Sequence, residues 1–318
     1  MATREAALRI AFPERRVRSP WAMAFRQLRR NRLAMASAIF IILLTLSAIF
    51  AKYIAPYPYD EANLRDYYAL PGKKYLAGAD FMGRDILSRT IYGTRVSLSV
   101  AIVAATVSLV VGITYGLISG YFGGRIDELM MRVVDFLYGI PTLIVVILMQ
   151  VYFKALARRG GATGLAGLLI NANKAMGGLL FVFIAMGLVN WITMARITRG
   201  QVLSYKEKEF IEAAYMVGAS TPRIIFRHLL PNVLGPCIVQ ETLSIPGYIL
   251  TEAFLSFIGL GVDPPTPSWG LMIQEGYQGL RSYPHVIFTP SIALTITVLA
   301  FNFLGDGLRD ALDPRLYE

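Results

Sequence analysis

The chain has 318 residues, of which 55% are hydrophobic and only 16% are charged, and its mean hydropathy is +0.51. Because soluble domains carry about 25% charged residues, this composition excludes an ordinary water-soluble domain and indicates a protein embedded in lipid. The net charge of +10 gathers near the ends of apolar segments, which indicates contact with membrane lipid and predicts no nucleic-acid partner.

Six apolar segments predict the fold. A membrane-spanning helix needs about 20 mostly apolar residues, and the segments that qualify are 33–54, 96–120, 133–153, 178–198, 233–258 and 286–305. None of them alternates with the period of two that barrel strands show, so helices are the structure that satisfies their backbone in lipid. We therefore predict an all-α integral membrane protein with six transmembrane helices.

The basic residues predict the orientation of the chain. The chain divides into a basic tail (1–32), a first transmembrane helix (33–54), a long polar outer loop (55–95) and a five-helix core (96–318). The core contains an inner loop at 199–232. Nine basic residues in the tail place both termini in the cytoplasm. Within the tail, WAMAFRQLRRNR (21–32) is either an amphipathic interfacial helix or a plain charged anchor. The first apolar segment is longer than a signal peptide, so we expect it to be retained.

The second span carries a stripe of small residues. Ala104, Ser108, Gly112, Gly116 and Gly120 recur every four residues, and four residues advance a helix by about 400°. Such a stripe lets another helix approach closely, which is how helices associate in lipid. The sequence leaves open whether the approaching helix belongs to this chain or to a partner.

Charged residues inside the predicted spans suggest pairing or a polar path. Arg132 and Asp135 stand three residues apart, a spacing that predicts an ion pair on one helix face. In the fifth span Glu241 and Glu252 are eleven residues apart, hence about 20° apart around the helix. Ionised groups in a span usually face a water-filled path or a partner, so both glutamates are candidate path-lining residues, with Glu252 alternatively bonding to a loop. Pro246 is expected to bend this helix.

The inner segment EFIEAAYMVGASTPRIIFRHLLP (209–231) predicts a helix, a bend and a second helix. Its first half places Phe210, Ala213, Ala214 and Val217 at the spacing of one amphipathic face. Gly218 can stop that helix in a left-handed conformation. Thr221 and Pro222 are an N-cap and first-turn proline for the second helix, and Pro231 is expected to end it. The small central surface fits a groove in another protein; the alternative is a cap on this chain's own bundle.

The sequence predicts neither a metal site nor catalytic residues. Cys237 is the single cysteine, and His228 and His285 fall on opposite sides of the membrane in the predicted topology. The phosphate-binding pattern GxxxxGK[ST] is absent as well. We therefore expect a chain that is not an enzyme and that does not hydrolyse ATP by that route.

Four stretches carry a resemblance to a known family. EAAYMVGASTPRIIFRHLLPN resembles the EAA loop of ABC-importer permeases, and its His228 resembles the dipeptide/oligopeptide branch. GADFMGRDILSRTIYGTRVSL (78–98), ILTEAFLSFIGLGVDPPTPSWG (249–270) and NFLGDGLRDALDPRL (302–316) resemble blocks of the second permease subunit of that branch. The residues of the loop that match the family's coupling motif, or line it, are Glu212, Ala213, Ala214, Gly218, Pro222, His228 and Pro231.

The resemblance implies a larger machine in a bacterial or archaeal cytoplasmic membrane. It implies a type I ABC-importer permease fold with an extra N-terminal helix and a cytoplasmic coupling helix. The implied partners are a second homologous permease forming a heterodimer, two ATP-binding subunits that hold the ATP and Mg, and an extracytoplasmic binding protein that delivers di- or oligopeptides; this chain itself would carry no cofactor. The alternatives are a non-peptide substrate such as a nickel chelate, glutathione or an oligosaccharide, or an ion-coupled secondary transporter.

Overall fold

The computed structural model describes residues 20–159 and 163–312. Most of the predicted tail and the last six residues lie outside the described residues. Short 3₁₀ (η1) and π (η2, η3) segments adjoin the α-helices. In chain order the elements are α2 (Pro20–Leu28), α3 (Arg32–Ile49), α4 (Ala51–Ile54), η1 (Leu64–Asp66), α5 (Ile86–Val107), η2 (Ser108–Gly112), α6 (Ile113–Phe122), α7 (Gly124–Tyr138), α8 (Thr142–Arg159), α9 (Gly164–Ala175), α10 (Leu179–Lys206), α11 (Glu209–Met216), α12 (Thr221–Arg223), η3 (Ile224–Leu229), α13 (Leu230–Phe257), α14 (Trp269–Tyr277) and α15 (His285–Leu312).

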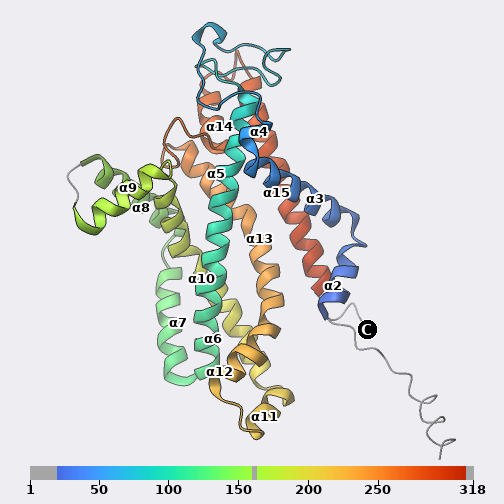
Figure 1. The fold of residues 1–318 in the computed structure, drawn as a ribbon. Coiled ribbons are helices and arrows are strands. Elements are labelled where there is room, and N and C mark those ends of the chain that lie inside the picture. Colours follow the sequence, from blue (N-terminus) through green and yellow to red (C-terminus); the bar gives the residue numbers. More distant parts are fainter. Residues whose placement is uncertain (1–19, 160–162, 313–318) are drawn as a thin grey trace, which may run out of the picture.

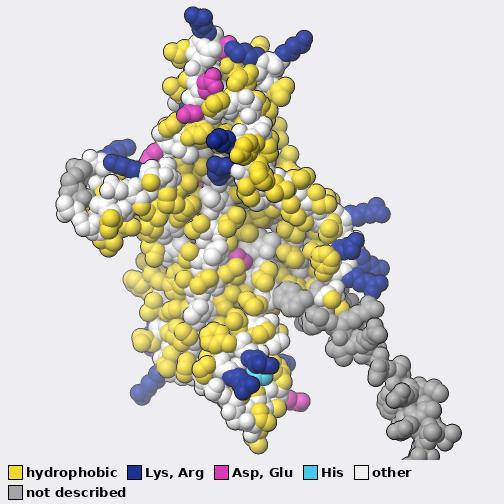
Figure 2. Space-filling view, viewed as in Figure 1, with side chains coloured by type: hydrophobic (Ala, Val, Ile, Leu, Met, Phe, Trp, Pro, Cys, Tyr) yellow, Lys and Arg dark blue, Asp and Glu magenta, His cyan; other side chains and the backbone are white. Residues whose placement is uncertain are grey.

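The long helices form an elongated bundle with a different structure at each end. Figure 1 shows α14 and the folded segment 55–85 at one end, and α11 and α12 at the other. We call these ends the head and the hairpin. Hydrophobic side chains cover most of the visible surface between them (Figure 2). This arrangement matches a bundle that crosses a membrane and exposes polar structure on both sides.

Within residues 20–159 and 163–312, five helical stretches are long and apolar enough to span a membrane, and the number rises to six if one bent pair counts as a span. The bent pair is α7 and α8, which meet at 76°. The predicted third span, 133–153, crosses this break, so it is not a straight helix. Pro141 stands between the two helices; proline lacks an N–H and restricts the residue before it, which explains the interruption.

Two of the differences from the predicted helix boundaries have a clear local cause. The second span begins at Ile86, earlier than 96, because Asp85 caps it by accepting a hydrogen bond from the Ser88 N–H at 2.7 Å. Pro231 does not end the second hairpin helix: Thr221–Phe257 is one helical stretch. The π-helical turn Ile224–Leu229 leads into α13 and leaves Pro231 in its first turn, where a missing N–H costs little.

The stripe of small residues packs inside this chain. A Cβ added to Gly112, Gly116 or Gly120 would lie 2.6, 2.5 or 2.8 Å from the Cβ of Met194, Thr198 or Val202 respectively. Both series advance by four residues in the same direction, so α6 and α10 run parallel in close contact. Of the two possibilities left open by the sequence, the partner is therefore α10 of the same subunit.

Replacing Gly116 with leucine is expected to lower the free energy of unfolding by about 1–3 kcal/mol, because the side chain overlaps Thr198 and the Ala195 carbonyl oxygen. Thermal unfolding of the purified protein in detergent measures the change. Gly200→Ala on α10 is the control, since a Cβ there meets nothing within 4 Å and should leave stability unchanged or slightly raised. Equal melting temperatures for Gly116→Leu and the wild type would contradict this packing.

The predicted pair of Arg132 and Asp135 does not form. Arg132 instead pairs with Glu128 one turn earlier on α7, at 2.5 Å. Asp135 pairs with Arg196 of α10, also at 2.5 Å. Residues four apart on a helix can pair as well as residues three apart, which explains the pair of Glu128 and Arg132. Asp135 finds its partner on α10, and the sequence around Asp135 does not reveal that neighbour.

A cluster of three buried charges and one partly buried charge holds the head together. Asp80 and Arg84 come from the segment before α5, Arg89 from its first turns, and Glu275 from α14. Arg84 Nε donates to Asp80 at 2.7 Å, and Arg89 Nη2 donates to Glu275 at 2.8 Å. Asp80, Arg84 and Arg89 are at most 4% exposed. The cluster therefore ties segments almost 200 positions apart in the chain into one body, with equal numbers of positive and negative charges.

Candidate functional site: the inner hairpin

The hairpin begins with α11 and turns at Gly218. Gly218 has φ +77°, a left-handed conformation that glycine adopts without strain. Its N–H bonds to the Tyr215 carbonyl at 2.9 Å, and the Ala219 N–H bonds to the Ala214 carbonyl at 3.0 Å. These bonds satisfy carbonyls that the helix end would otherwise leave free. The predicted stop at Gly218 is therefore confirmed as a backbone feature.

The second helix begins one residue from where its cap was predicted. Ser220 occupies the N-cap position without a side-chain cap bond, and Thr221 and Pro222 form the first turn. Thr221 accepts a hydrogen bond from the Tyr121 hydroxyl at 3.1 Å, and Tyr121 accepts one from Tyr215 at 3.0 Å. Partial burial and the bond to Tyr121 raise the pKa of Tyr215 to about 12, so its hydroxyl stays protonated at neutral pH.

Three aliphatic side chains anchor the hairpin to the bundle. Ile211, Ile224 and Leu229 are fully buried, in a cluster with Val202 and Val233. The predicted amphipathic face is confirmed as one face: Phe210, Ala213, Ala214 and Val217 all line the same groove, and Ala214 is the one of the four that is buried. The buried face is set by Ile211 and Ala214, three residues apart, a pattern that the sequence also contained. What remains exposed is therefore an apolar surface available to another molecule.

A groove of about 480 Å³ runs along the exposed side of the hairpin. One wall comes from α11 and the other from α12 and η3. Of the predicted coupling residues, Ala213, Ala214, Gly218 and His228 line this groove, whereas Glu212, Pro222 and Pro231 are exposed at the surface around it. The fold thus brings the predicted coupling residues to one end of the molecule, where a partner can reach them.

The two glutamates of the fifth span are buried within the bundle. Glu241 Oε2 accepts a hydrogen bond from Ser108 at 2.8 Å, and Glu252 accepts bonds from Ser97 at 2.8 Å and Ser256 at 2.7 Å. Glu241 is 3% exposed and Glu252 is fully buried. Their shared face is turned toward the second span, whose serines stand eleven residues apart like the glutamates. Sequence reasoning named Ser108 only as a small residue of the stripe and missed the contact of both serines with the glutamates, although their matching spacing was a usable signal.

Pro246 lies buried inside α13 between the two glutamates, and α13 continues as one helix on both sides of it. Within the described residues, no group of three His, Cys, Asp or Glu side chains could hold a metal ion. The geometry of the core is thus one of serine–carboxylate contacts between neighbouring helices.

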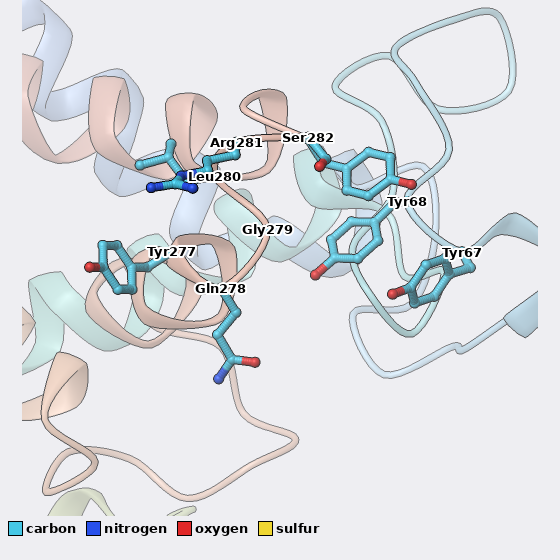
Figure 3. Close-up of a pocket in the computed structure, with 9 residues that line it drawn as sticks. Tyr67, Tyr68, Tyr277, Gln278, Gly279, Leu280, Arg281 and Ser282 are labelled. Atoms are coloured by element: carbon cyan, nitrogen blue, oxygen red, sulfur yellow. The ribbon is translucent and has the colours of Figure 1, made fainter.

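A second groove, of about 600 Å³, opens on the head. Figure 3 shows Tyr67 and Tyr68, from the segment before α5, opposite the turn that follows α14. Tyr68 stacks on Tyr283 with ring centroids 4.2 Å apart. Tyr67 and Tyr277 are 57% and 62% exposed. The head therefore presents an aromatic groove at the opposite end from the hairpin.

Comparison with known proteins identifies the family. The family described as "Binding-protein-dependent transport system inner membrane component" matches residues 112–317, and "N-terminal TM domain of oligopeptide transport permease C" matches residues 19–71. The structure is similar to the inward-facing MetNI methionine ABC transporter, with a TM-score of 0.53 at 18% identity, covering 72% of this chain and 98% of that chain. This likeness confirms the predicted type I permease fold.

Curated relatives agree over almost the whole chain. The oligopeptide transport permease OppC of Bacillus subtilis is 42% identical, covering 94% of this chain and 90% of the relative. The dipeptide transport permease DppC of the same organism is 40% identical, covering 92% and 85%. The glutathione transport permease GsiD of Pectobacterium atrosepticum is 38% identical, covering 95% and 94%. The chain therefore belongs to the family of inner-membrane components of binding-protein-dependent transport systems, as a multi-pass ABC-transporter permease subunit rather than an enzyme.

Proposed function

We propose that this chain forms one half of the path by which di- and oligopeptides enter the cell. Its relatives named for oligopeptide and dipeptide transport are 42% and 40% identical over nearly its full length. A second homologous permease would complete the path as a heterodimer, and an extracytoplasmic binding protein would deliver the peptide. The head, with its aromatic groove, would face that binding protein, and the hairpin and both termini would then lie in the cytoplasm.

The hairpin is the proposed coupling site. It is anchored by buried Ile211, Ile224 and Leu229, while the small residues Ala213 and Gly218 lie at its surface. The proposal rests on this combination of buried anchoring side chains and a surface with little side-chain bulk. A partner can approach such a surface closely, and its motion is transmitted because the contact is rigid. Two ATP-binding subunits, holding ATP and Mg, would grip the hairpins of the two permeases. Their different affinity for the two permease states would drive transport.

Affinity purification of the tagged chain from its native membrane tests the assembly. The expected co-purifying proteins are a second permease and ATP-binding subunits, and uptake of a labelled dipeptide should be lost when this chain is deleted. Unchanged dipeptide and oligopeptide uptake after deletion would contradict the peptide proposal. The glutathione permease relative supports glutathione as a second candidate substrate; loss of glutathione uptake alone would decide for it.

Of the two core glutamates, Glu241 is the stronger candidate for the translocation path. Its Oε1 has no hydrogen-bond partner among the described residues, whereas both oxygens of Glu252 have one. A cysteine at position 241, with Cys237 replaced by serine, should react with a water-soluble maleimide only when the transporter cycles with ATP, because position 241 is buried in this conformation. Protection in every nucleotide state would show that Glu241 is structural; a cysteine at 252 is the matched comparison.

A further inference from the structure

The exposed charges of the hairpin are largely separated by sign, with Lys208, the N-cap residue of α11, as the exception beside the acidic pair. Glu209 and Glu212 lie in the first turn of α11, and Arg223 and Arg227 lie four residues apart beyond the bend. All four are exposed, and within the described residues none of them forms an ion pair with another side chain. Figure 2 shows dark blue and cyan side chains gathered at this end, with magenta beside them. The hairpin therefore exposes an acidic pair and a basic pair, and both pairs are available to charges of another molecule.

The groove lies between an apolar wall and a basic wall. Phe210, Ala213 and Val217 of α11 form one side, and Arg223, Arg227 and His228 form the other. Val217 is 83% exposed. An occupant that satisfies both walls needs an apolar surface together with a negative group, which is the composition of a protein segment carrying an acidic side chain.

The groove is preformed. Ile224 and Leu229, at the two ends of η3, are fully buried, and so is Ile211 of α11. The π-helical turn thus fixes Arg227 and His228 on the wall, one turn after Arg223. Two guanidinium groups at this spacing can hold one carboxylate with charge-assisted hydrogen bonds. Because the backbone of this wall is already fixed, binding here orders only the two arginine side chains.

We propose that the groove receives an acidic side chain of the ATP-binding subunit, held by Arg223 and Arg227, while a basic group of that subunit faces Glu209 and Glu212. This inference rests on the proposed function and adds the charges that the partner must carry. Two pairs of opposite sign fix the direction in which the partner docks, since the reversed orientation would juxtapose like charges. The arginines are thus specificity-determining residues of the coupling contact.

The test uses the complete transporter in detergent. The double variant Arg223→Glu/Arg227→Glu should retain the ATP-binding subunit about tenfold less well than the wild type, and the remaining association should weaken less steeply as the NaCl concentration rises. Arg223→Lys/Arg227→Lys keeps the charges and should bind nearly normally. Arg125→Glu is the matched control, because Arg125 is exposed on α7 at the same end, outside the groove. Membrane content of each variant is measured in parallel, and the single variant Arg227→Glu replaces the double one if insertion fails.

Three results would overturn the inference in different ways. Unchanged association and salt dependence in the double variant, with loss in Gly218→Glu, would remove the charge assignment and leave the coupling proposal standing. Unchanged association in both variants would remove the coupling proposal itself. If the arginine variants keep the ATP-binding subunit but lose binding to vesicles containing phosphatidylglycerol, the basic wall serves anionic lipid instead.

Discussion

Gly218→Glu should abolish ATP-driven transport while leaving the protein inserted in the membrane. A Cβ at position 218 meets nothing within 4 Å in this chain, so the side chain would project into the space that the ATP-binding subunit must occupy. Burying an unpaired charge in a protein contact costs several kcal/mol, which corresponds to a loss of about 100-fold or more in affinity. Uptake in cells, together with membrane content by immunoblot, measures the effect.

Gly218→Asn is the control for backbone strain. The left-handed φ of +77° strains most side chains, but asparagine tolerates this region. We expect Gly218→Asn to transport at a reduced but clear rate. Gly218→Asp has a side chain of the same shape as asparagine but carries a charge, so a lower rate for Gly218→Asp than for Gly218→Asn would measure the effect of charge apart from backbone strain. Normal uptake by Gly218→Glu would show that nothing approaches this bend.

Arg89→Met should destabilise the head more than any surface change. The guanidinium is 1% exposed and pairs with Glu275 and Asp80, so its removal leaves buried carboxylates uncompensated. Breaking one partner of a buried ion pair typically costs about 3–5 kcal/mol. Thermal unfolding of the purified protein in detergent measures this loss.

Arg89→Met combined with Glu275→Leu removes one charge of each sign and should recover much of the lost stability, since buried pairs are often replaceable by apolar side chains. Lys74→Met is the control: its pair with Asp66 is exposed, and exposed pairs contribute little. If Arg89→Met unfolds at the wild-type temperature, the cluster is not what holds the head together.

The sequence predicted the membrane helices better than their ends. Length and hydropathy located the five helices of the described residues that can span a membrane, because a span must be long and apolar whatever it contacts; the sixth segment, 133–153, falls on the bent pair of α7 and α8. The true start at Ile86 depends on a cap by Asp85, inside a stretch that looked like polar loop. The break at Pro141 was overlooked because apolar residues continue on both sides of it. Helices α9 and α14 also lie outside the six predicted spans, in the stretches that connect them.

Contacts between helices were the limit of the sequence prediction. Periodicity correctly put Gly112, Gly116 and Gly120 on one face, but α10 as their partner came only from the fold. The same holds for the hairpin, where periodicity put Phe210 and Ala213 on one face but did not show that Ile211 is the residue that faces the core. A helical pattern identifies which residues share a face; what covers that face depends on elements distant in the chain.

The charges of the block GADFMGRDILSRTIYGTRVSL also have a partner that the sequence alone did not reveal. It was recognised only as a resemblance, with no role for its charges. In the fold, Arg84 and Arg89 of this block meet Glu275, which lies almost 200 residues later. Neither local spacing nor composition could supply that partner. The role of these residues is structural stabilisation of the head.

Reconstitution into vesicles tests the central claim, that a separate ATP-driven subunit moves this bundle through the hairpin. Vesicles holding this chain, the second permease and the ATP-binding subunits should take up peptide when ATP and the loaded binding protein are supplied. Omitting the ATP-binding subunits should stop uptake completely. Peptide uptake at the full rate by the permease subunits alone would contradict the account.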